Sequence, residues 1–379
     1  MRKAILCLLV LVLVAMQCTG AFAMEQTPGW ELDDPLEEYA FTFAFVGDTQ
    51  SVARYHPDKV TVLYDWLVEN ADAMNLKLVA GLGDITDTSD GDEWFVTTEA
   101  ISKLRGVVPY TVVRGNHDDV DSFDAYFNDS HYTGPLNYTY DGVLNSYYTF
   151  HVGTIKYLIL NLDFGPSSKT LEWGCNVLKA YPNHTAIIVT HGYIDAKGVP
   201  LTPQTSRYAP STLGGVNDGP AIWDQLVRKF PNISMVVCGH ISHPVIAAHE
   251  AIGDHGNSVW QVLADPQEVD RVQGPGGYVA LMHFSSDGKH VQVENFATIP
   301  GQRFGSILRF DVTCTGGDSM EEIIPPEEPE ETQPQTAAPT TVQRTPAPWV
   351  FVLVAVTTAA LVFCIILLIV VLVKDKRTK

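Results

Sequence analysis

The chain has 379 residues, 46% of them hydrophobic, and carries a formal net charge of −20 at pH 7. This length suffices for one large domain with a well-buried core and for further segments beside it. The acidic excess repels polyanions, which argues against a general nucleic-acid-binding protein, so we expect no nucleic acid as a partner. The composition allows no inference of a protein partner.

Residues 1–23 predict an export signal. A positive start at Arg2 and Lys3 precedes an apolar run over residues 4–16, and the small-x-small site Ala21-Phe22-Ala23 follows. We predict cleavage after that site. An uncleaved membrane anchor is the alternative, but the apolar run is short for a membrane span.

Residues 24–315 are predicted to form one folded domain. In its first part, short apolar runs alternate with stretches of helical spacing. We predict strands over Phe41–Val46, Leu76–Gly81 and Pro109–Val113, and helices over Pro57–Met74 and Glu93–Leu104. This alternation is typical of a layered α/β architecture.

Strands predominate in the rest of the domain. The runs Ser146–Val152 and Thr154–Leu160 predict a hairpin that turns at Gly153. Two further helices are predicted over Ser168–Ala180 and Ala221–Phe230. Six further strands are predicted over Thr185–Val189, Ile233–Val237, Ser258–Leu263, Tyr278–Phe284, His290–Phe296 and Gly305–Val312. Two β-sheets packed face to face, with helices outside, account for this order.

Three segments follow the folded domain. Residues 316–348, rich in Pro, Glu and Thr, predict a disordered stalk because they cannot build a core. Residues 349–373 contain no charge and are long enough to cross a hydrocarbon core of about 30 Å as a helix, which argues against a buried core helix. The basic tail 374–379 favours the cytoplasmic side. We therefore predict a single-pass type I protein of the cell membrane, held in the lipid bilayer by residues 349–373, with residues 24–315 outside the cytoplasm.

Five predicted strands end in a small residue followed by a carboxylate, amide or imidazole. These strand-end segments are Gly47-Asp48-Thr49-Gln50, Gly83-Asp84-Ile85-Thr86-Asp87, Gly115-Asn116-His117-Asp118, Thr190-His191-Gly192 and Gly239-His240-Ile241-Ser242-His243. Strand ends of a layered sheet meet at one rim, where ligand sites form. Oxygen and nitrogen donors collected there suit Mn, Fe, Zn or Mg better than a soft metal.

Each strand-end segment also has an ordinary structural interpretation. An aspartate that closes a strand often caps the next helix, which applies to Asp48 and Asp84. The segment 115–118 can be a polar turn, and His191 or His240 can be a hydrogen-bonded core residue. Five such segments in this order favour a shared metal site over five separate explanations.

Together these segments resemble the motifs of the calcineurin-like metallophosphoesterase superfamily, which includes purple acid phosphatases and secreted bacterial enzymes. The superfamily pattern is Asp-x-His, Gly-Asp-x-x-Asp, Gly-Asn-His-Asp/Glu, a later His and Gly-His-x-His, and the resemblance covers residues 41–296. It implies a four-layer α/β-β/α sandwich, in which two packed mixed sheets are flanked by helices. It also implies a hydrolase of phosphate mono- or diesters that uses two divalent or trivalent metal ions (Mn, Fe, Zn or Mg).

The resemblance assigns the metal ligands by motif. It implies that Asp84 bridges the two ions and that Asp48 binds the first, whereas Asn116, His191 and His240 bind the second. Two cations a few Å apart would lower the pKa of a water molecule between them and neutralise phosphate oxygens during in-line attack.

The resemblance also assigns the acid. It implies that His117 protonates the leaving group or stabilises the charge that develops there, and that Asp118 orients His117. Arg114 is a weaker candidate for contact with a phosphate oxygen. Asp163 is a candidate for the pocket lining or for a turn, and we assign no chemistry to the segment 263–267.

Two positions depart from the superfamily pattern. Gln50 stands where the superfamily has His, and as a weaker oxygen donor it binds the first metal feebly or through water. Ser242 occupies the place of the last histidine in Gly-His-x-His, and His243 comes one residue later. His243 reaches the metal only if the turn bulges, so ligand and surface residue are equal alternatives for it.

Two other functions remain open at this stage. A degenerate, non-catalytic surface binding module would explain Gln50 and the shifted His243, but it would have no use for an acid such as His117. A metal-dependent nuclease ranks last because the acidic chain is a poor partner for long polyanions. The substrate is set by the loops 119–145 and 194–219, and the second loop is predicted to form a lid or a pocket wall.

Overall fold

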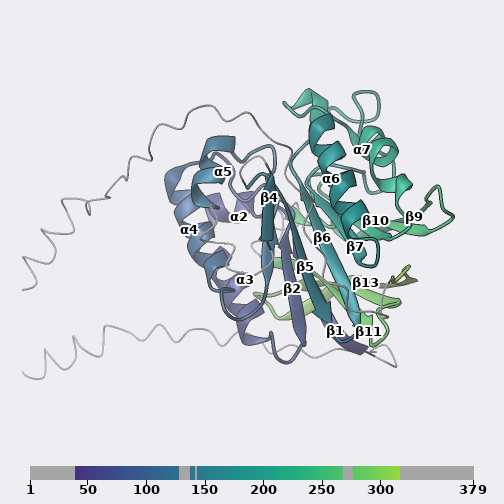
Figure 1. The fold of residues 1–379 in the computed structure, drawn as a ribbon. Helices are drawn as coiled ribbons and strands as arrows, with labels where there is room; N and C mark the ends of the chain where they lie inside the picture. Colours follow the sequence, from purple (N-terminus) through teal and green to yellow (C-terminus); the bar gives the residue numbers. More distant parts are fainter. Residues whose placement is uncertain (1–38, 128–136, 141–142, 268–275, 316–379) are drawn as a thin grey trace, which may run out of the picture. The chain divides into compact units, whose positions relative to one another are not determined.

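Two mixed β-sheets lie face to face, and helices cover the outer face of each (Figure 1). This arrangement is seen in a computed structural model, which describes residues 39–127, 137–140, 143–267 and 276–315, with backbone alone for 137–140. The four layers confirm the predicted α/β-β/α sandwich.

The first sheet has six strands in the order β13-β12-β11-β1-β2-β3. The three strands β1, β2 and β3 run parallel, and β11 pairs antiparallel with β1 and begins an antiparallel extension. The strands are β1 (Tyr39–Val46), β2 (Leu76–Gly81), β3 (Tyr110–Val112), β11 (Tyr278–Ser285), β12 (His290–Ala297) and β13 (Gln302–Asp311).

The second sheet has seven strands in the order β4-β5-β6-β7-β8-β10-β9. Its centre, from β6 to β10, is parallel, and antiparallel strands lie at both edges. The strands are β4 (Asn137–Tyr140), β5 (Asn145–Val152), β6 (Ile155–Leu162), β7 (Thr185–Thr190), β8 (Ile233–Cys238), β9 (Ala247–Ile252) and β10 (Ser258–Leu263). Parallel strands end at the same edge, which places the predicted site segments together.

The space between the sheets is filled by one aromatic and aliphatic core. Side chains alternate along a strand, so Phe41, Phe43 and Phe45 of β1 point between the sheets while Ala44 and Val46 point toward the helices. The ring of Phe43 lies 5.1 Å from the ring of Tyr157 on β6, centroid to centroid. Burial of each such large side chain contributes roughly 1.5–3 kcal/mol.

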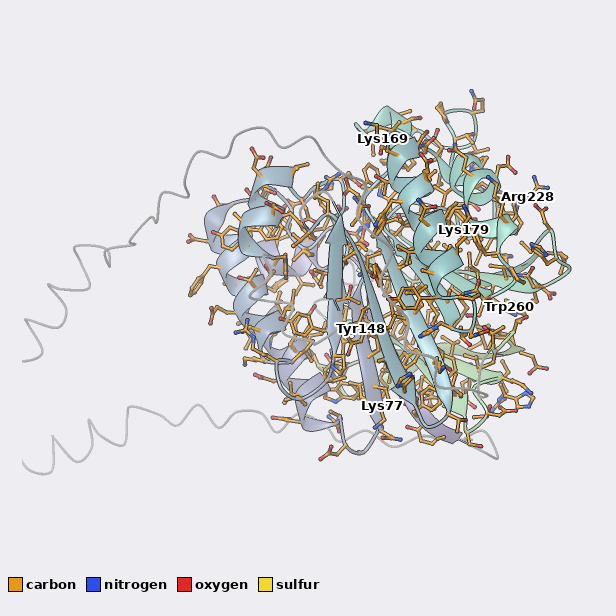
Figure 2. The ribbon with its side chains drawn as sticks, in the orientation of Figure 1. Lys77, Tyr148, Lys169, Lys179, Arg228 and Trp260 are labelled. Carbon is orange, nitrogen blue, oxygen red and sulfur yellow. The ribbon has the colours of Figure 1, made fainter. Side chains whose placement is uncertain are left out.

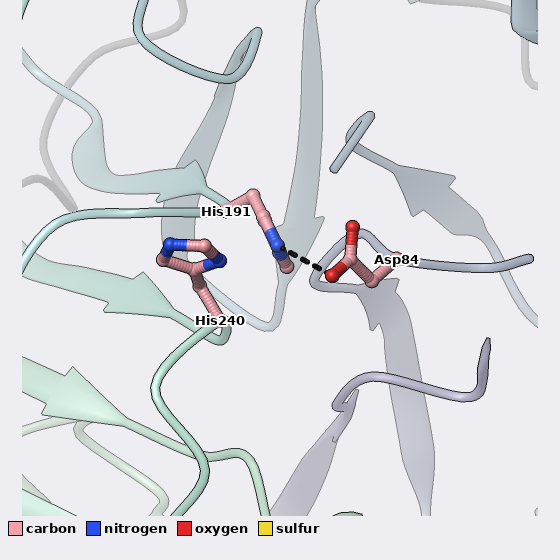
Figure 3. A group of neighbouring side chains, drawn as sticks. All are labelled: Asp84, His191 and His240. Carbon is pink, nitrogen blue, oxygen red and sulfur yellow. Dashed lines mark ion pairs between the residues drawn. The ribbon is translucent and has the colours of Figure 1, made fainter. Parts of the chain in front are cut away.

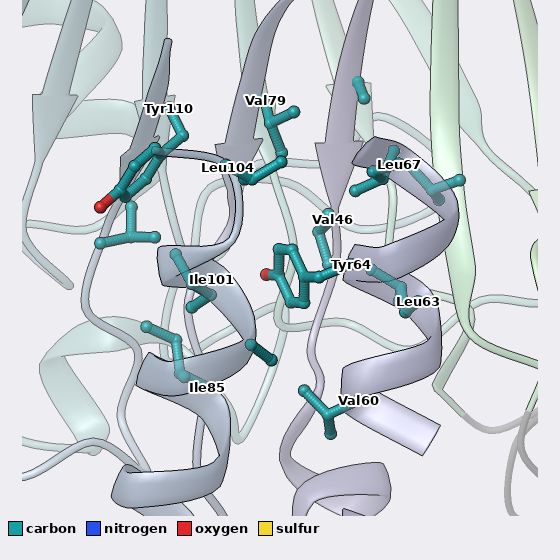
Figure 4. Close-up of a cluster of buried hydrophobic side chains, with 14 of the residues drawn as sticks. Val46, Val60, Leu63, Tyr64, Leu67, Val79, Ile85, Ile101, Leu104 and Tyr110 are labelled. Atoms are coloured by element: carbon teal, nitrogen blue, oxygen red, sulfur yellow. The ribbon is translucent and has the colours of Figure 1, made fainter. Parts of the chain in front are cut away.

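Two helices pack on the outer face of the first sheet. Figure 4 shows Leu63, Tyr64 and Leu67 on one helix, and Ile101 and Leu104 on or just beyond the other, directed toward the strands. These helices are α3 (Pro57–Glu69) and α4 (Gly91–Ser102), and the short helices α2 (Gln50–Tyr55) and α5 (Val120–Tyr126) lie at the ends of the strands that precede them.

The outer face of the second sheet is covered by α6 (Ser168–Ala180) and α7 (Gly219–Gln225). Ser167 begins α6 because its side chain accepts a hydrogen bond from the backbone of Thr170 at 3.1 Å. Leu171, Val177 and other apolar residues of α6 face the sheet, whereas Lys169 and Lys179 are exposed (Figure 2). Two 3₁₀ turns, η1 (Pro210–Thr212) and η2 (Val227–Lys229), complete the set.

Every strand and helix predicted from the sequence is present, with ends that shift by a few residues. The largest differences are in the predicted helices 57–74 and 221–230, which end at Glu69 and Gln225. Among the helices and strands of the described residues, α2, α5, β4 and β9 were not predicted, and neither was the short 3₁₀ turn η1. Each has seven residues or fewer, too few for a periodic pattern to stand out.

The predicted signal 1–23, stalk 316–348, span 349–373 and tail 374–379 lie outside the described residues. Among the residues that are described, no helix is both long and apolar enough to cross a bilayer. The predicted membrane anchor therefore stays a prediction.

Candidate metal centre

The strand-end side chains of the two sheets meet at one rim. Asp84 follows β2 of the first sheet, and His191 and His240 follow β7 and β8 of the second. One ligand atom from each of these three residues lies within 4.8 Å of the others (Figure 3). Side chains from three strand ends, the outermost of which are 156 positions apart in the sequence (residues 84 and 240), thus lie close together in space.

His191 directs a bare nitrogen at Asp84. Its Nδ1 lies 2.7 Å from the carbonyl oxygen of Leu82, which only accepts, so Nδ1 carries the proton. Nε2 lies 3.2 Å from Oδ2 of Asp84, and the imidazole is fully buried, with no hydrogen bond at Nε2 among the residues that the structure describes. The lone pair on Nε2 and the carboxylate of Asp84 repel each other unless a positive charge lies between them or a proton is bound to one of them. Without a metal ion, a proton meets this need: burial lowers the pKa of His191, but Asp84 outweighs it and raises that pKa.

His240 is held in a similar way. Its backbone has a φ of +74°, and its Nε2 lies 2.7 Å from the carbonyl oxygen of Tyr208, which leaves Nδ1 free to bind a cation. The ring of Phe164 lies 5.2 Å from the His240 ring and 5.6 Å from the His191 ring. Burial, assisted by His191, lowers the pKa of His240 to about 4, so this imidazole is neutral and available as a ligand near neutral pH.

Asp84 is the buried carboxylate at the centre of the group. Its φ is +47°, an unusual value for a residue with a side chain, and its Oδ1 accepts a hydrogen bond from the backbone of His117 at 2.9 Å. Burial tends to raise the pKa of Asp84, but the nearby His191 and His117 lower it overall. The carboxylate is therefore anionic, as a metal ligand must be.

Asp48, Gln50 and Asn116 are the other predicted ligands from the first sheet. The Oδ1 of Asp48 accepts from the backbone of His240 at 3.1 Å, which joins the two sheets directly. Gln50 and Asn116 each contain a buried side-chain oxygen without a hydrogen-bond partner among the described residues. Buried polar atoms are normally paired. Together with Nε2 of His191, these oxygens are donor atoms that a divalent metal ion would satisfy, so the residues present fit the metals that the motifs imply.

His117 lies on the open side of the rim, with 39% of its side chain exposed. Its Nδ1 lies 2.7 Å from the carbonyl oxygen of Asp87, and 3.5 Å from Oδ1 of the same residue. The ring is therefore oriented by Asp87, and its Nε2 is directed elsewhere. This geometry corrects the role expected for Asp118.

Asp118 supports the loops instead. Its buried carboxylate accepts hydrogen bonds from the backbone of Ile85, Thr86 and Gly115 at 2.9–3.1 Å, and from the Thr86 hydroxyl. These bonds tie the loop after β2 to the loop after β3. Burial, with Asp84 nearby, raises the pKa of Asp118 although the backbone bonds oppose that shift.

Arg114 and His243 both form hydrogen bonds within the protein. The guanidinium of Arg114 donates to Oδ1 of Asp163 at 2.8 Å and to the carbonyl oxygens of Gly115 and Asp118. The ring of His243 donates through Nδ1 to the carbonyl oxygen of Val245 at 2.7 Å, and His243 is not part of the group formed with Asp84.

Asp265 and Gln267 lie at the same rim, and the sequence predicted no chemistry for them. They follow β10, which is parallel to β8, so they lie at the same rim as His240. The amide nitrogen of Gln267 is 3.0 Å from Oδ2 of Asp48 and 3.3 Å from Oδ2 of Asp265. Burial raises the pKa of Asp265 to about 6, and burial followed by Asp265 raises the pKa of Asp48. The signal that could have found them is the same one used elsewhere, a carboxylate directly after a parallel strand.

Comparisons with known proteins place this geometry in context. The chain is similar in structure to GAP50, the anchor in the inner membrane complex of Plasmodium, at 12% identity over 72% of this chain and 89% of that one, with a TM-score of 0.44. It is also similar to the purple acid phosphatase PPD1 of yellow lupin seeds, at 13% identity over 72% of this chain and 53% of that one, with a TM-score of 0.42.

A curated sequence relative is the uncharacterised protein YvnB of Bacillus subtilis, 27% identical over 278 residues. The match covers 69% of this chain but 20% of YvnB, so the chain spans about a fifth of that relative's length. The model of the calcineurin-like phosphoesterase family matches residues 41–244, more than half of the chain. With its strand-end ligands gathered at the rim of two packed sheets, the chain belongs to the calcineurin-like phosphoesterase family.

Proposed function

We propose that the protein is a metal-dependent hydrolase of phosphate mono- or diesters that works with two metal ions at the rim of the two sheets. The observation that carries this proposal is the convergence of Asp84, His191 and His240 within 4.8 Å, with the bare Nε2 of His191 facing a carboxylate oxygen. When bound, two such ions supply Lewis acidity toward phosphate oxygens and lower the pKa of a water molecule.

The chain's own residues would perform the other tasks. His117 lies half exposed beside the centre, and the hydrogen bond of its Nδ1 to Asp87 leaves Nε2 to deliver a proton to the leaving oxygen. Asp118 keeps the loops of Asp84 and His117 in register through its backbone bonds. The loop 194–219 reaches the centre at Tyr208, whose carbonyl binds His240, in keeping with a pocket wall.

We further propose that this chemistry takes place outside the cytoplasm. The support is the predicted signal 1–23 and the predicted span 349–373, with the charge-free length of the second as the stronger part. The lipid bilayer is the partner in this proposal, and the phosphate ester is the substrate.

The test is hydrolysis of p-nitrophenyl phosphate and its bis-ester by the purified full-length protein with Mn²⁺ or Zn²⁺ added. We expect turnover in the wild type and none in Asp84→Asn, because that change removes a central anionic ligand. The matched control is Asp254→Asn, an exposed aspartate in the turn between β9 and β10, which should keep full activity. No turnover on either ester, together with no metal by elemental analysis, would instead identify a binding module on the same fold.

The acid role of His117 has a separate readout. His117→Ala should lower kcat by about 10²–10⁴ for an ester with an alkyl leaving group, and by less for p-nitrophenyl esters, whose leaving group needs no proton. The control is His255→Ala, at an exposed histidine in the turn between β9 and β10, which should keep kcat unchanged for both kinds of ester. Equal losses for both kinds of leaving group would rule out proton transfer by His117.

A further inference from the structure

The carboxylate of Asp265 lies at the rim because of the strand that precedes it. In the parallel pair β8–β10, Leu263 is opposite Cys238, so the residues that follow each strand emerge side by side. His240 follows β8 and Asp265 follows β10. Asp265 lies beyond residues 41–244, the part of the chain that matches the family model.

Asp265 and Asp48 form a buried pair of carboxyl groups. Their exposed fractions are 1% and 5%, and a side-chain hydrogen bond links them. The amide nitrogen of Gln267 donates to both, at 3.3 Å and 3.0 Å. Within the described part of the chain, no lysine or arginine pairs with either group. Two buried carboxylates without a basic partner are costly unless they share a proton, as the hydrogen bond between them implies, or a cation is bound beside them.

Gln50 is connected to these two carboxyl groups and contributes a side-chain oxygen, Oε1. Gln50 has 8% of its surface exposed, and its Nε2 donates to Oε1 of Gln267 at 3.0 Å, which places the Gln50 amide in the same hydrogen-bonded group. Its Oε1 is buried and has no hydrogen-bond partner in the part of the chain that the structure describes. A buried, unpaired amide oxygen, on a side chain that is joined through Gln267 to two carboxyl groups, is a donor that suits a hard cation.

The imidazole that the superfamily pattern would supply is used differently here. The backbone nitrogen of His243 donates to the carbonyl oxygen of Asp265 at 2.7 Å, and its ring Nδ1 donates to Val245. His243 thus holds the backbone of Asp265 while its ring is held by its own loop.

We propose that Asp265 is a ligand of the first metal ion, in the place of the expected histidine, and that Asp48, Asp265 and Gln50 make this site an all-oxygen one. Gln267 is a positioning residue that fixes the two carboxyl groups relative to each other. The inference rests on the proposed function, since it assigns one of the two metal sites.

The proposal makes the two sites chemically unlike. An all-oxygen site prefers Mn²⁺ or Mg²⁺, whereas the site with His191, His240 and Asn116 offers imidazole nitrogen and suits Zn²⁺ or Fe. The protein should therefore hold two different ions when both kinds are offered, with the oxygen site as the weaker and more exchangeable for Zn²⁺.

Metal binding by the full-length protein tests this without any substrate. Chelator-stripped wild type, Asp265→Asn and the control Asp254→Asn are titrated with Mn²⁺, and metal content and the Mn²⁺ electron paramagnetic resonance spectrum are recorded. We expect two ions per chain and a spin-coupled signal in the wild type and the control. Asp265→Asn, which keeps the shape but removes the charge, should bind one ion tightly, lose at least about tenfold affinity for the second, and show an uncoupled signal.

Two further variants separate the outcomes. His243→Ala should still bind two ions, and Gln50→Met, similar in size but without the amide oxygen, should weaken the same ion as Asp265→Asn. If Asp265→Asn does not fold, unchanged affinity for both ions in Gln50→Met contradicts the all-oxygen site. Two ions with unaltered affinities in a folded Asp265→Asn overturn the inference and leave the proposed function standing. A wild type that binds no metal at all overturns the proposed function itself.

Discussion

Asp84 has room in its left-handed conformation only because its neighbour Gly115 has no side chain. A Cβ at Gly115 would lie 2.1 Å from Oδ1 and 2.2 Å from the backbone nitrogen of Asp84. Oδ1 accepts the hydrogen bond from the backbone of His117, and the nitrogen is part of the main chain, so neither can move away easily. The absence of a side chain at Gly115 therefore leaves the space that Asp84 occupies.

Gly115→Ala should accordingly displace Asp84. We expect a loss of about 1–3 kcal/mol in the free energy of unfolding, as for other overpacked sites, and a metal content below that of the wild type. Urea unfolding and elemental analysis measure the two effects. In the control Gly91→Ala, the nearest atom to the new Cβ is 4.0 Å away, so stability and metal content should hold. A fully metal-loaded Gly115→Ala would contradict the packing argument.

His184 makes stability depend on pH at a point away from the metal centre. Burial, with a smaller effect of Lys156, lowers its pKa from 6.5 to about 4. The folded state thus holds His184 neutral, while the unfolded state takes up a proton below pH 6.5. The stability it contributes is present above pH 6.5 and is lost as the pH falls toward 4.

Replacement by Gln should therefore flatten the acid side of the stability curve. Between pH 7.5 and 5, the free energy of unfolding should fall more in the wild type than in His184→Gln, as measured by urea unfolding at each pH. His255→Gln, at an exposed histidine, should follow the wild type. Parallel curves for the wild type and His184→Gln would show that His184 has the same pKa in the folded and the unfolded protein.

At this scale the sequence located most of the centre but not the partners of each side chain. Five strand-end segments were enough to find Asp84, His191 and His240, because residue type and strand direction decide that placement. They could not tell that Asp87 rather than Asp118 bonds the His117 ring, since that depends on loop curvature. Asp265 was missed because no family motif draws attention to it.

At the scale of elements, α5 depends on a single residue at its start. The carboxylate of Asp119 accepts from the backbone and the hydroxyl of Ser122, both at 2.9 Å. Asp118, one position earlier, is fully used inside the protein. The chain therefore turns from buried loop to exposed helix between two adjacent aspartates.

Asp119→Ala should cost about 1 kcal/mol in the free energy of unfolding, the usual effect of removing an N-cap. Activity and metal content should change little, because Asp119 contacts no member of the centre. Chemical denaturation measures the difference, and Asp72→Ala, at an exposed carboxylate in a turn, provides the baseline. A loss of metal in Asp119→Ala would mean that α5 holds the loop of His117 in place.

The long elements were predictable and the short ones were not. Burial on both faces makes β2, β7 and β8 mostly apolar, with Lys77 in β2 and Ser234 in β8 as interruptions, and such runs stand out in the sequence. In contrast, α5 has one buried residue and β9 has none, so tertiary contacts rather than a sequence pattern determine them.

At the scale of the whole domain, the centre joins the two sheets. Asp48, Asp84 and Asn116 extend from strands of the first sheet, and His191, His240 and Asp265 extend from strands of the second. An ion held by both sets binds the folded state alone, and so stabilises it by mass action.

Removal of metal should therefore loosen the domain as a whole. At a free metal concentration a hundredfold above Kd, one ion contributes about 2.7 kcal/mol, which a chelator should abolish as a lower Tm in calorimetry. His191→Ala should be less stable to begin with but should respond little to chelator, whereas Asp254→Asn should respond as the wild type does. An identical Tm with and without chelator in the metal-loaded wild type would show that the ions do not bridge the sheets.

The donor side chains come from both sheets, so the aromatic and aliphatic core between the sheets sets the distance between the two groups of donors. A smaller side chain in this core, as in Met235→Ala, would let the two sheets move closer together. Core residues that contact no metal ion would then be under selection for catalysis. Substitutions among them would change which cation the site prefers while every ligand stays the same.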